Sequence, residues 1–458
     1  MATTPYFIIS PNTVLSILGL LHGPDKTVPT PPEDWRRATV DVVIPALNEE
    51  RNITLCLESL IRQTLRPRSI ILIDDGSNDH TLFYAKTFCE VNGLEVITVQ
   101  RKAPIGKTPT IKRQAREFDS DVEFILDSDT VLESDNYIER TVQELYQAVG
   151  IASACGTILP LRERDRRAVL AAPSVKKFLG AVPDAAVLPH NGWMKRLQRG
   201  ISNLYRDVLY VFLQRFVYRG QMVFFGTITN PVGCAVAYRR KYVKDLFDKY
   251  EPLFGDDLTN SEDIFIGFAM LNKGYRNIQL TDVFARSEEP EAARLPRQIY
   301  MWSSSFLQSC FYFDALLKSP LKALKRYRQR RQVKKEVLEK RKIQEPYRQS
   351  FGEEYTEKYG RPMGWVLLMS AIEKVFFPFV LLIMAVLRLW EPLAITVAAE
   401  SLLSVCVITI IAPRNRIGYL LKGLAVIPIR YLSLLFDLVT LGRFSADLWI
   451  SRNRRWRK

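Results

Sequence analysis

Short apolar runs alternate with amphipathic stretches in the first part of the chain. The runs DVVIPAL, SIILIDD, LEVITV and VEFILD lie between Asp41 and Asp127, and each is followed by sequence with helical periodicity. Continuous Val, Ile and Leu runs are typical of strands buried on both faces. Strands that alternate with helices predict a mostly parallel α/β sheet, in which ligands bind at the carboxyl ends of the strands. Acidic clusters follow two of these runs, so we expect the functional site at that edge.

The pattern changes after Arg162. Up to Arg219 the sequence is charged and aromatic, and its apolar residues recur at helical spacing, which favours packed helices over a cofactor site. A strand-like segment, GTITNPVGCAVAYRR, begins at Gly226. The segment SEDIFIGFAMLNKGY then predicts a helix with Ser261 as its N-cap and Gly274 as its end.

Long apolar segments fill most of the last quarter of the chain. Residues 366–387 and 393–411 are each long enough to span a bilayer. Residues 418–441 contain charged residues and a proline, and basic residues flank both ends. We therefore expect a re-entrant or interface-lying element there, with a full span as the competing interpretation. Residues 7–21 are interrupted by Pro11 and favour an interfacial or re-entrant anchor.

The charge distribution also indicates a membrane. Lys and Arg outnumber Asp and Glu by 64 to 49, and much of this surplus lies in residues 318–348 and at the C-terminal end. These clusters flank apolar segments, so they favour a membrane surface over nucleic acid, with a solvated basic helix as the alternative. The patterns together predict an N-terminal interfacial segment and linker (1–38), an α/β domain (39–300), amphipathic and basic interfacial helices (301–362), a membrane domain (363–442) and a basic tail (443–458).

Cysteine and histidine usage limits the chemistry. The six cysteines are scattered without a CxxC pair, and the chain has three histidines. Neither a zinc cluster nor a disulfide framework is indicated. Any metal should therefore be held by carboxylates.

Two acidic clusters follow predicted strands. Asp127 and Asp129 leave the strand VEFIL with one residue between them, so their oxygens are placed to hold Mg²⁺ or Mn²⁺. Asp74 and Asp75 end the strand SIILI, where a carboxylate accepts hydrogen bonds from a nucleobase or ribose. For each cluster alone, a solvated acidic turn is the structural alternative.

Three further sites carry candidate chemistry. Glu262 and Asp263 begin a predicted helix, where a carboxylate either stabilises the helix end or takes a proton from a hydroxyl. Lys107 follows Gly106 near a helix start and is placed to approach a diphosphate. Gln298 and Trp302 lie four residues apart, and the indole offers either a sugar-stacking surface or an interfacial anchor.

Six segments, taken in order, carry a family resemblance. VIPALNEE, LIDDGSND, GKTPTIKRQA, ILDSDT, NSEDIFIG and RQIYMW resemble motifs of the family 2 inverting glycosyltransferases with a GT-A fold. The membrane-bound processive branch, which includes hyaluronan, chitin, cellulose and alginate-type synthases, is the most similar. The resemblance covers residues 41–305, and the apolar segments that follow fit the architecture of that branch.

The resemblance implies a role for each motif residue. Donor binding falls to five residues at the strand ends: Glu49, Asp74, Asp75, Lys107 and Asp127. Asp127 and Asp129 are the expected ligands of Mg²⁺ or Mn²⁺. Asp263 corresponds to the general base, with Glu262 beside it. Gln298 and Trp302 correspond to the motif that closes on the donor and lines the acceptor site.

One residue departs from the family pattern. Met301 stands where the motif has an arginine before its tryptophan, and a thioether cannot pair with phosphate oxygens. We expect Arg297 to reach in from a neighbouring face. If no residue replaces that charge, a non-catalytic assembly subunit with the same fold is the alternative.

The resemblance implies a sugar transfer with inversion from a nucleotide diphosphate donor, for which we expect a UDP-sugar. The preferred acceptor is a growing polysaccharide, made processively and exported through the membrane. A single transfer to a lipid carrier is the alternative. The expected partners are the bilayer, a glycan acceptor and export or assembly proteins, without nucleic acid. We expect a multi-pass protein of the inner membrane with a cytoplasmic catalytic domain.

Overall fold

A computed structural model gives the fold for residues 10–22, 34–147, 150–185, 192–254, 259, 261–338, 351–412 and 415–450. The strands in these ranges form one eight-stranded sheet with the order β3-β2-β1-β4-β7-β6-β8-β5. They are β1 Val40–Ala46, β2 Ser69–Asp74, β3 Ile97–Gln100, β4 Val122–Leu126, β5 Thr130–Leu132, β6 Ile151–Pro160, β7 Ala235–Arg239 and β8 Arg276–Ser287. Strands β1 to β4 run parallel, β7 is antiparallel to both of its neighbours, and β8 is parallel to β6.

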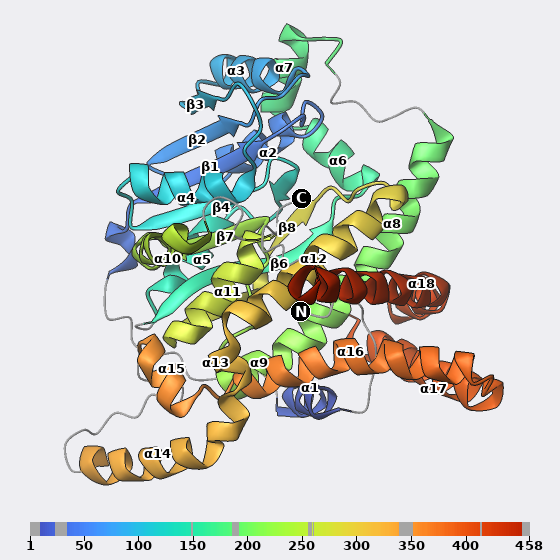
Figure 1. The fold of residues 1–458 in the computed structure, drawn as a ribbon. Helices are drawn as coiled ribbons and strands as arrows, with labels where there is room; N and C mark the ends of the chain where they lie inside the picture. Colours follow the sequence, from blue (N-terminus) through green and yellow to red (C-terminus); the bar gives the residue numbers. More distant parts are fainter. Residues whose placement is uncertain are drawn as a thin grey trace.

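The predicted fold class is confirmed. The four apolar runs form β1 to β4, and their carboxyl ends meet at one edge of the sheet (Figure 1). The strand-like segment after Gly226 is a strand only from Ala235, because Pro231 has no N–H to donate to a ladder. Strands β5, β6 and β8 were not predicted.

The helices that flank the sheet or follow it have these bounds. They are α1 Pro11–His22, α2 Ile53–Ile61, α3 Thr81–Asn92, α4 Lys107–Glu117, α5 Tyr137–Leu145, α6 Glu163–Leu170, α7 Pro173–Ala181, α8 Trp193–Phe212, the π-helical turn η2 Leu213–Val217, α9 Tyr218–Phe225, α10 Arg240–Phe254, α11 Glu262–Lys273, α12 Leu295–Tyr312, α13 Asp314–Leu317, α14 Ala323–Leu338, α15 Glu353–Tyr359, α16 Gly364–Val386, α17 Trp390–Ile411 and α18 Arg416–Trp449. Short 3₁₀ turns are η1 Trp35–Arg37, η4 Ala292–Arg294 and η5 Ser319–Lys322.

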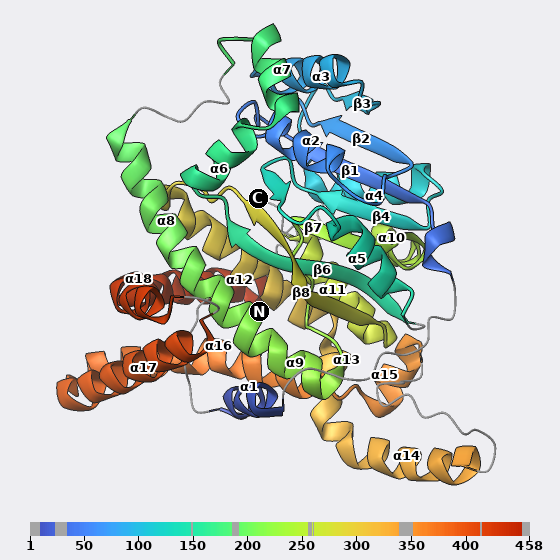
Figure 2. The ribbon, with the colours of Figure 1, turned by 180° about the vertical axis from the view of Figure 1, so that it is seen from behind.

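The sheet separates two apolar cores. Helices α2, α3, α5 and α7 pack on one face, while α4, α10, α11 and α12 pack on the other (Figures 1 and 2). Successive residues of a strand point to opposite faces, so Val42 enters the first core and Val43 the second. Helix α11 begins after Ser261 and ends at Gly274, which has a positive φ of 85°, as the sequence predicts. This helix start holds Glu262 and Asp263 near the ends of the parallel strands.

Helix α1 lies against α9 through small residues. A Cβ added to Gly19 would lie 2.5 Å from the Cα of Gly220, so the two helices approach closely only because both residues are glycine. Pro11 is the first residue of α1 and does not interrupt it, because the first turn of a helix needs no N–H from that position. Leu18 and Leu21 are exposed, which fits the predicted interfacial anchor.

Three C-terminal helices are long and apolar enough to cross a membrane. They are α16, α17 and α18, with 23, 22 and 34 residues. The first two correspond to the predicted spans. The third is one continuous helix that contains Pro428, so the expectation of a re-entrant element is corrected, and a full span or an interface-lying helix remains. It ends at Trp449, beyond the predicted boundary at 442, and residues 451–458 of the predicted tail lie outside the described ranges.

Two buried ion pairs join charged residues of these helices. The Nζ of Lys374 lies 2.7 Å from Oδ1 of Asp437 on α18, and both groups contact the hydroxyl of Ser303 on α12. Arg430 pairs with Glu400 between α18 and α17. A charge in an apolar environment is costly unless it is paired. These pairs therefore fix the C-terminal helices to one another and to α12.

Candidate active site

Asp75 organises the loop that leads into α4. Its carboxylate accepts hydrogen bonds from the N–H groups of Ile105, at 3.0 Å, and Gly106, at 2.7 Å, and Arg101 lies 2.9 Å away. Gly106 has a φ of 93°, a conformation that favours glycine. The aspartate predicted to hold a nucleoside therefore holds the loop itself, and in this way it sets the position of Lys107 at the first turn of α4.

Lys107 brings three separate motifs together. Its Nζ lies 2.7 Å from Oδ1 of Asp127 and 2.8 Å from Oε1 of Glu262, and it donates to the carbonyl oxygen of Gly233 at 3.1 Å. Burial alone lowers the pKa of Lys107, but the two carboxylates outweigh it and raise that pKa well above its usual value. The ammonium group is thus held in its charged form between the end of β4 and the start of α11.

Asp129 lies in a crowded acidic environment. Its Oδ1 accepts from the hydroxyls of Thr130, at 3.1 Å, and Ser287, at 3.3 Å. Burial, and then the charges of Glu49 and Asp127, raise the pKa of Asp129 well above its usual value. A divalent cation would relieve this repulsion, so the residues fit the predicted metal. Within the described ranges, no group of three or more His, Cys, Asp or Glu side chains is placed to hold a metal ion, so a cation here would need ligands from the donor or from water.

Asp263 has the environment expected of a proton acceptor. Its Oδ1 accepts from the Ser261 hydroxyl at 2.5 Å and the Ile264 N–H at 2.8 Å, and its Oδ2 accepts from the Gly233 N–H at 3.2 Å. A Cβ added to Gly233 would lie 2.8 Å from Cβ of Asp263, so this close approach requires glycine. Burial and the neighbouring Glu262 charge raise the pKa of Asp263 to about 6.

Gln298 and Trp302 meet an arginine from a different helix. Arg206 on α8 is completely buried, donates a hydrogen bond to Oε1 of Gln298 and lies with its Cζ 4.3 Å from the centroid of the Trp302 ring. Its Nε is 3.1 Å from Oε2 of Glu289. A guanidinium group stacked on an indole gains from both charge and planar contact.

The guanidinium group next to Gln298 and Trp302 therefore comes from α8. Met301 and Arg297 are both exposed, and the guanidinium group that touches the motif belongs to Arg206. Sequence reasoning missed Arg206, which lies 92 residues before Gln298 on an amphipathic helix whose other arginines look alike.

Glu49 and Asp74 lie at the adjacent strand ends. Oε2 of Glu49 accepts from the amide of Asn52 at 2.7 Å, and burial raises the pKa of Glu49. Asp74 is buried at the end of β2, where its Oδ1 accepts from the Ser77 N–H at 3.0 Å. Glu49 thus borders the acidic cluster around Asp129, whereas Asp74 holds the turn that follows β2.

Contacts link most of the predicted site residues to one another, whereas Arg297 is exposed and is not among them. The Glu288 N–H donates to the carbonyl oxygen of Asp129 at 3.0 Å, and the adjacent Glu289 pairs with Arg206 beside Trp302. On the other side, Asp127 and Glu262 meet through Lys107. Motifs that are far apart in the chain are therefore assembled at the carboxyl edge of the sheet.

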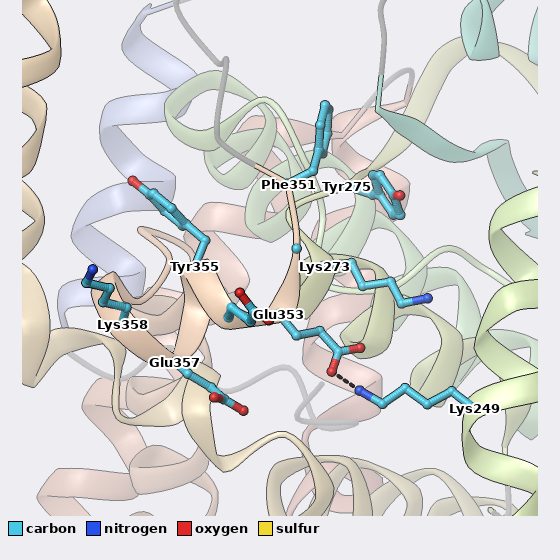
Figure 3. Close-up of a pocket in the computed structure, with 10 residues that line it drawn as sticks. Lys249, Lys273, Tyr275, Phe351, Glu353, Tyr355, Glu357 and Lys358 are labelled. Carbon is cyan, nitrogen blue, oxygen red and sulfur yellow. Dashed lines mark hydrogen bonds and ion pairs between the residues drawn. The ribbon is translucent and has the colours of Figure 1, made fainter.

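A pocket of about 750 Å³ lies elsewhere on the surface, between α10, α11 and α15 (Figure 3). Lys249 pairs with Glu353 there, and the aromatic rings of Tyr275, Phe351 and Tyr355 contribute to the lining. The pocket contains none of the predicted site residues.

Comparison with known proteins bears on the domain that carries these strand ends. Residues 41–247 match the family model described as Glycosyl transferase family 2. This part of the chain is therefore similar to family 2 glycosyltransferase domains. The matched region ends before α11 and α12, so it does not include Asp263 or Trp302. What is said of these two residues is based on their contacts in the structure.

Two curated relatives match over part of their length. An N-acetylglucosaminyltransferase of Azorhizobium caulinodans is 26% identical over 271 residues, which is 58% of this chain and 59% of the relative. An undecaprenyl-phosphate 4-deoxy-4-formamido-L-arabinose transferase of Serratia proteamaculans is 29% identical over 120 residues, which is 25% of this chain and 37% of the relative. The chain thus spans less than two thirds of each of these relatives.

Among solved structures, this chain is similar to a mannosyltransferase from Pyrobaculum calidifontis in complex with GDP-Man and Mn²⁺. It is 14% identical to this chain, covers 96% of it with 99% of its own length and superposes with a TM-score of 0.49.

Proposed function

We propose that the protein transfers a sugar from a nucleotide diphosphate donor to an acceptor hydroxyl at a membrane surface, with inversion at the anomeric carbon. The observation that carries this proposal is the contact of Lys107 with Asp127 and Glu262. It joins the end of β4, the start of α4 and the start of α11 at one point. Each of these segments belongs to a motif of the glycosyltransferase resemblance.

The donor diphosphate is expected beside Lys107 and Asp129. The ammonium group of Lys107 is charged and only partly exposed, so it offers a cation for the phosphate oxygens. Asp129, with Asp127, would hold Mg²⁺ or Mn²⁺, which when bound neutralises charge on the departing nucleotide. Oδ1 of Asp127 is already paired with the Nζ of Lys107, so Asp129 is the principal candidate ligand of the metal ion.

Asp263 is the proposed general base. A carboxylate with a pKa of about 6 is ionised at neutral pH and still basic enough to take a proton from an acceptor hydroxyl as the reaction proceeds. The acceptor oxygen bonds to the anomeric carbon, while the bond to the departing diphosphate oxygen breaks. Attack from the face opposite the leaving group inverts the configuration, so an α-linked donor gives a β-linked product.

Arg206 is the proposed substitute for the arginine that the tryptophan motif lacks. It positions Gln298 and Trp302 and contributes a buried positive charge next to them. Arg206 therefore supports a catalytic protein over a non-catalytic assembly subunit, because the only reason for that alternative was Met301 in place of the motif arginine.

The C-terminal helices bear on the choice between two acceptors, a sugar on a lipid carrier and a growing polysaccharide. Inside these helices Lys374 and Glu400 are paired with Asp437 and Arg430, rather than facing an open path for a glycan. This pairing favours transfer to a lipid-linked acceptor, with the C-terminal helices as an anchor in the inner membrane and the α/β domain in the cytoplasm. Processive polymerisation with export is the alternative version.

Two readouts test the proposal. The purified full chain, in detergent or vesicles with Mg²⁺ or Mn²⁺, should release nucleotide from one member of a panel of nucleotide sugars. Asp129→Asn should abolish that release. Product sizing then separates the versions, because a single-sugar lipid indicates the carrier reaction and a long glycan indicates polymerisation. Equal release by the wild type and Asp129→Asn would refute the role of this residue.

A further inference from the structure

Three arginines converge on a single carboxylate next to the candidate metal ligand. Arg51 follows β1, Arg166 lies on α6 and Arg199 lies on α8, yet all three contact Glu288. The Nη1 of Arg51 is 3.4 Å from Oε1 of Glu288, and the Nη2 of Arg166 is 3.3 Å from Oε2. Each guanidinium group is positively charged, and Glu288 is the carboxylate that all three contact, while Glu163 and other acids act on them without a contact of this kind.

The hydrogen-bonding capacity of this cluster exceeds what Glu288 uses. A guanidinium group has five N–H donors in a planar fork that fits phosphate oxygens. The Nε atoms of Arg51 and Arg199 are buried and have no hydrogen-bond partner among the described residues. Burial and the charge of Arg51 also lower the pKa of Arg166 and of Arg199 to about 10. Buried donors without partners, in groups that repel one another, favour an additional anion.

The position of the cluster separates it from the proposed donor contacts. Lys107 approaches the Asp127 side of the site. The arginines lie on the Glu288 side, where the Glu288 N–H meets the carbonyl oxygen of Asp129 and Asn52 bridges Glu288 to Glu49. Two separate cationic centres therefore flank the candidate metal ligand, one on each side.

Helix α8 connects this second centre to the apolar C-terminal helices. Val208 and Phe212 on α8 pack in one cluster with Ile408 on α17 and Val426 on α18. In addition, Lys422 on α18 lies 2.6 Å from Asp207 on α8. Arg199 is thus on a helix that leads from the site to the proposed membrane anchor.

We propose that Arg51, Arg166 and Arg199 bind a phosphate group of the acceptor, so that the acceptor is a phosphate-bearing molecule whose sugar hydroxyl is the nucleophile. This inference rests on the proposed function and names its acceptor class. A prenyl diphosphate sugar and a soluble sugar phosphate share this chemistry. The neutral end of a long glycan does not.

The test measures binding without turnover, so its result does not depend on the transfer reaction. The full chain in detergent is saturated with UDP and Mg²⁺ to fill the proposed donor site. It is then titrated with citronellyl diphosphate, glucose 1-phosphate and the neutral alcohol citronellol. Arg199→Gln removes the most exposed of the three guanidinium groups. Arg167→Gln is the matched control, because Arg167 is an exposed arginine on α6 next to Arg166.

The wild type and Arg167→Gln should bind a phosphate-bearing probe at least about ten-fold more tightly than Arg199→Gln, the loss expected for one charged hydrogen-bonding partner. Arg199→Lys keeps the charge, so it should bind the probe more tightly than Arg199→Gln. That result would also show that the folded protein tolerates a substitution at this position. Tight binding of citronellyl diphosphate alone assigns the phosphate to a lipid, and equal binding of glucose 1-phosphate assigns it to a soluble sugar phosphate.

Three results would overturn the inference. They are equal binding by the wild type and Arg199→Gln, equally tight binding of citronellol, and loss of probe binding in every variant when UDP is saturating. The last result would assign the cluster to the donor diphosphate. Failure of nucleotide-sugar turnover with intact, Arg199-dependent phosphate binding would instead count against the proposed function alone.

Discussion

Replacement of Asp263 by asparagine separates its chemical role from its structural role. The single oxygen of asparagine is able to accept from the Ser261 hydroxyl and the Ile264 N–H, as Oδ1 does now. Its NH₂ group would then face the Gly233 N–H, donor against donor. The substitution therefore removes the base and also leaves one backbone N–H without its partner.

The two effects have different magnitudes. Loss of a general base lowers turnover by about 10² to 10⁴. An unpaired buried N–H costs about 1 to 3 kcal/mol of stability, which a melting curve reports. Ser261→Ala is the matched control, because it removes a hydrogen bond to the same carboxylate and leaves the base in place.

The assay is nucleotide release at saturating donor, followed between pH 5 and pH 8. In the wild type the rate should rise as Asp263 ionises near pH 6 and then become constant. The Ser261 hydroxyl stabilises the ionised form, so Ser261→Ala should move this rise to higher pH while most of the maximal rate remains. If Asp263→Asn and Ser261→Ala lose the same fraction of the maximal rate, Asp263 has only a structural role.

Four other predictions use different contacts. Lys107→Met leaves the carboxylates of Asp127 and Glu262 without their cation and should lower the melting temperature and raise the KM for the donor by more than ten-fold; an unchanged KM would count against the diphosphate contact. Gly233→Ala forces Asp263 to move, so turnover should fall at an unchanged donor Kd, and full turnover would contradict the close approach. Arg206→Met should reduce turnover more than Arg206→Lys and change the fluorescence of the tryptophan it stacks on, and identical rates would argue against a role for its charge. Lys374→Met leaves its aspartate partner on α18 unpaired and should destabilise the protein by about 3 kcal/mol in thermal unfolding, whereas no change would show that the pair is not buried.

Much of the strand edge could be predicted from local pattern. Asp75 and Asp127 follow buried apolar runs, and parallel strands bring their carboxyl ends to one edge. The start of α11 could be read in the same way, because Ser261 and Gly274 are typical helix-end residues. Sequence reasoning therefore placed Asp75, Asp127 and Glu262 at this edge, but it did not find Glu288 and Glu289.

The basic part of the site could not be predicted in this way. Arg206 and Arg199 come from one helix whose arginines have no local feature that distinguishes a buried position from an exposed one. Their partners Gln298 and Glu288 lie about ninety residues further along the chain, and only the tertiary packing of α8, against β6, η4, α17 and α18, brings them together. For the same reason Arg297 was the expected substitute for the motif arginine, although it is exposed.

The most direct test of the central claim is a nucleotide-sugar transfer assay on the purified full chain in lipid vesicles. A panel of nucleotide sugars is offered with Mn²⁺ and prenyl diphosphate sugar acceptors, and the anomeric configuration of the product is determined by NMR. The prediction is metal-dependent release of nucleotide from one donor and a product of inverted configuration, both lost in Asp263→Asn. A product of retained configuration, or transfer that survives in Asp263→Asn at the wild-type rate, would contradict the account.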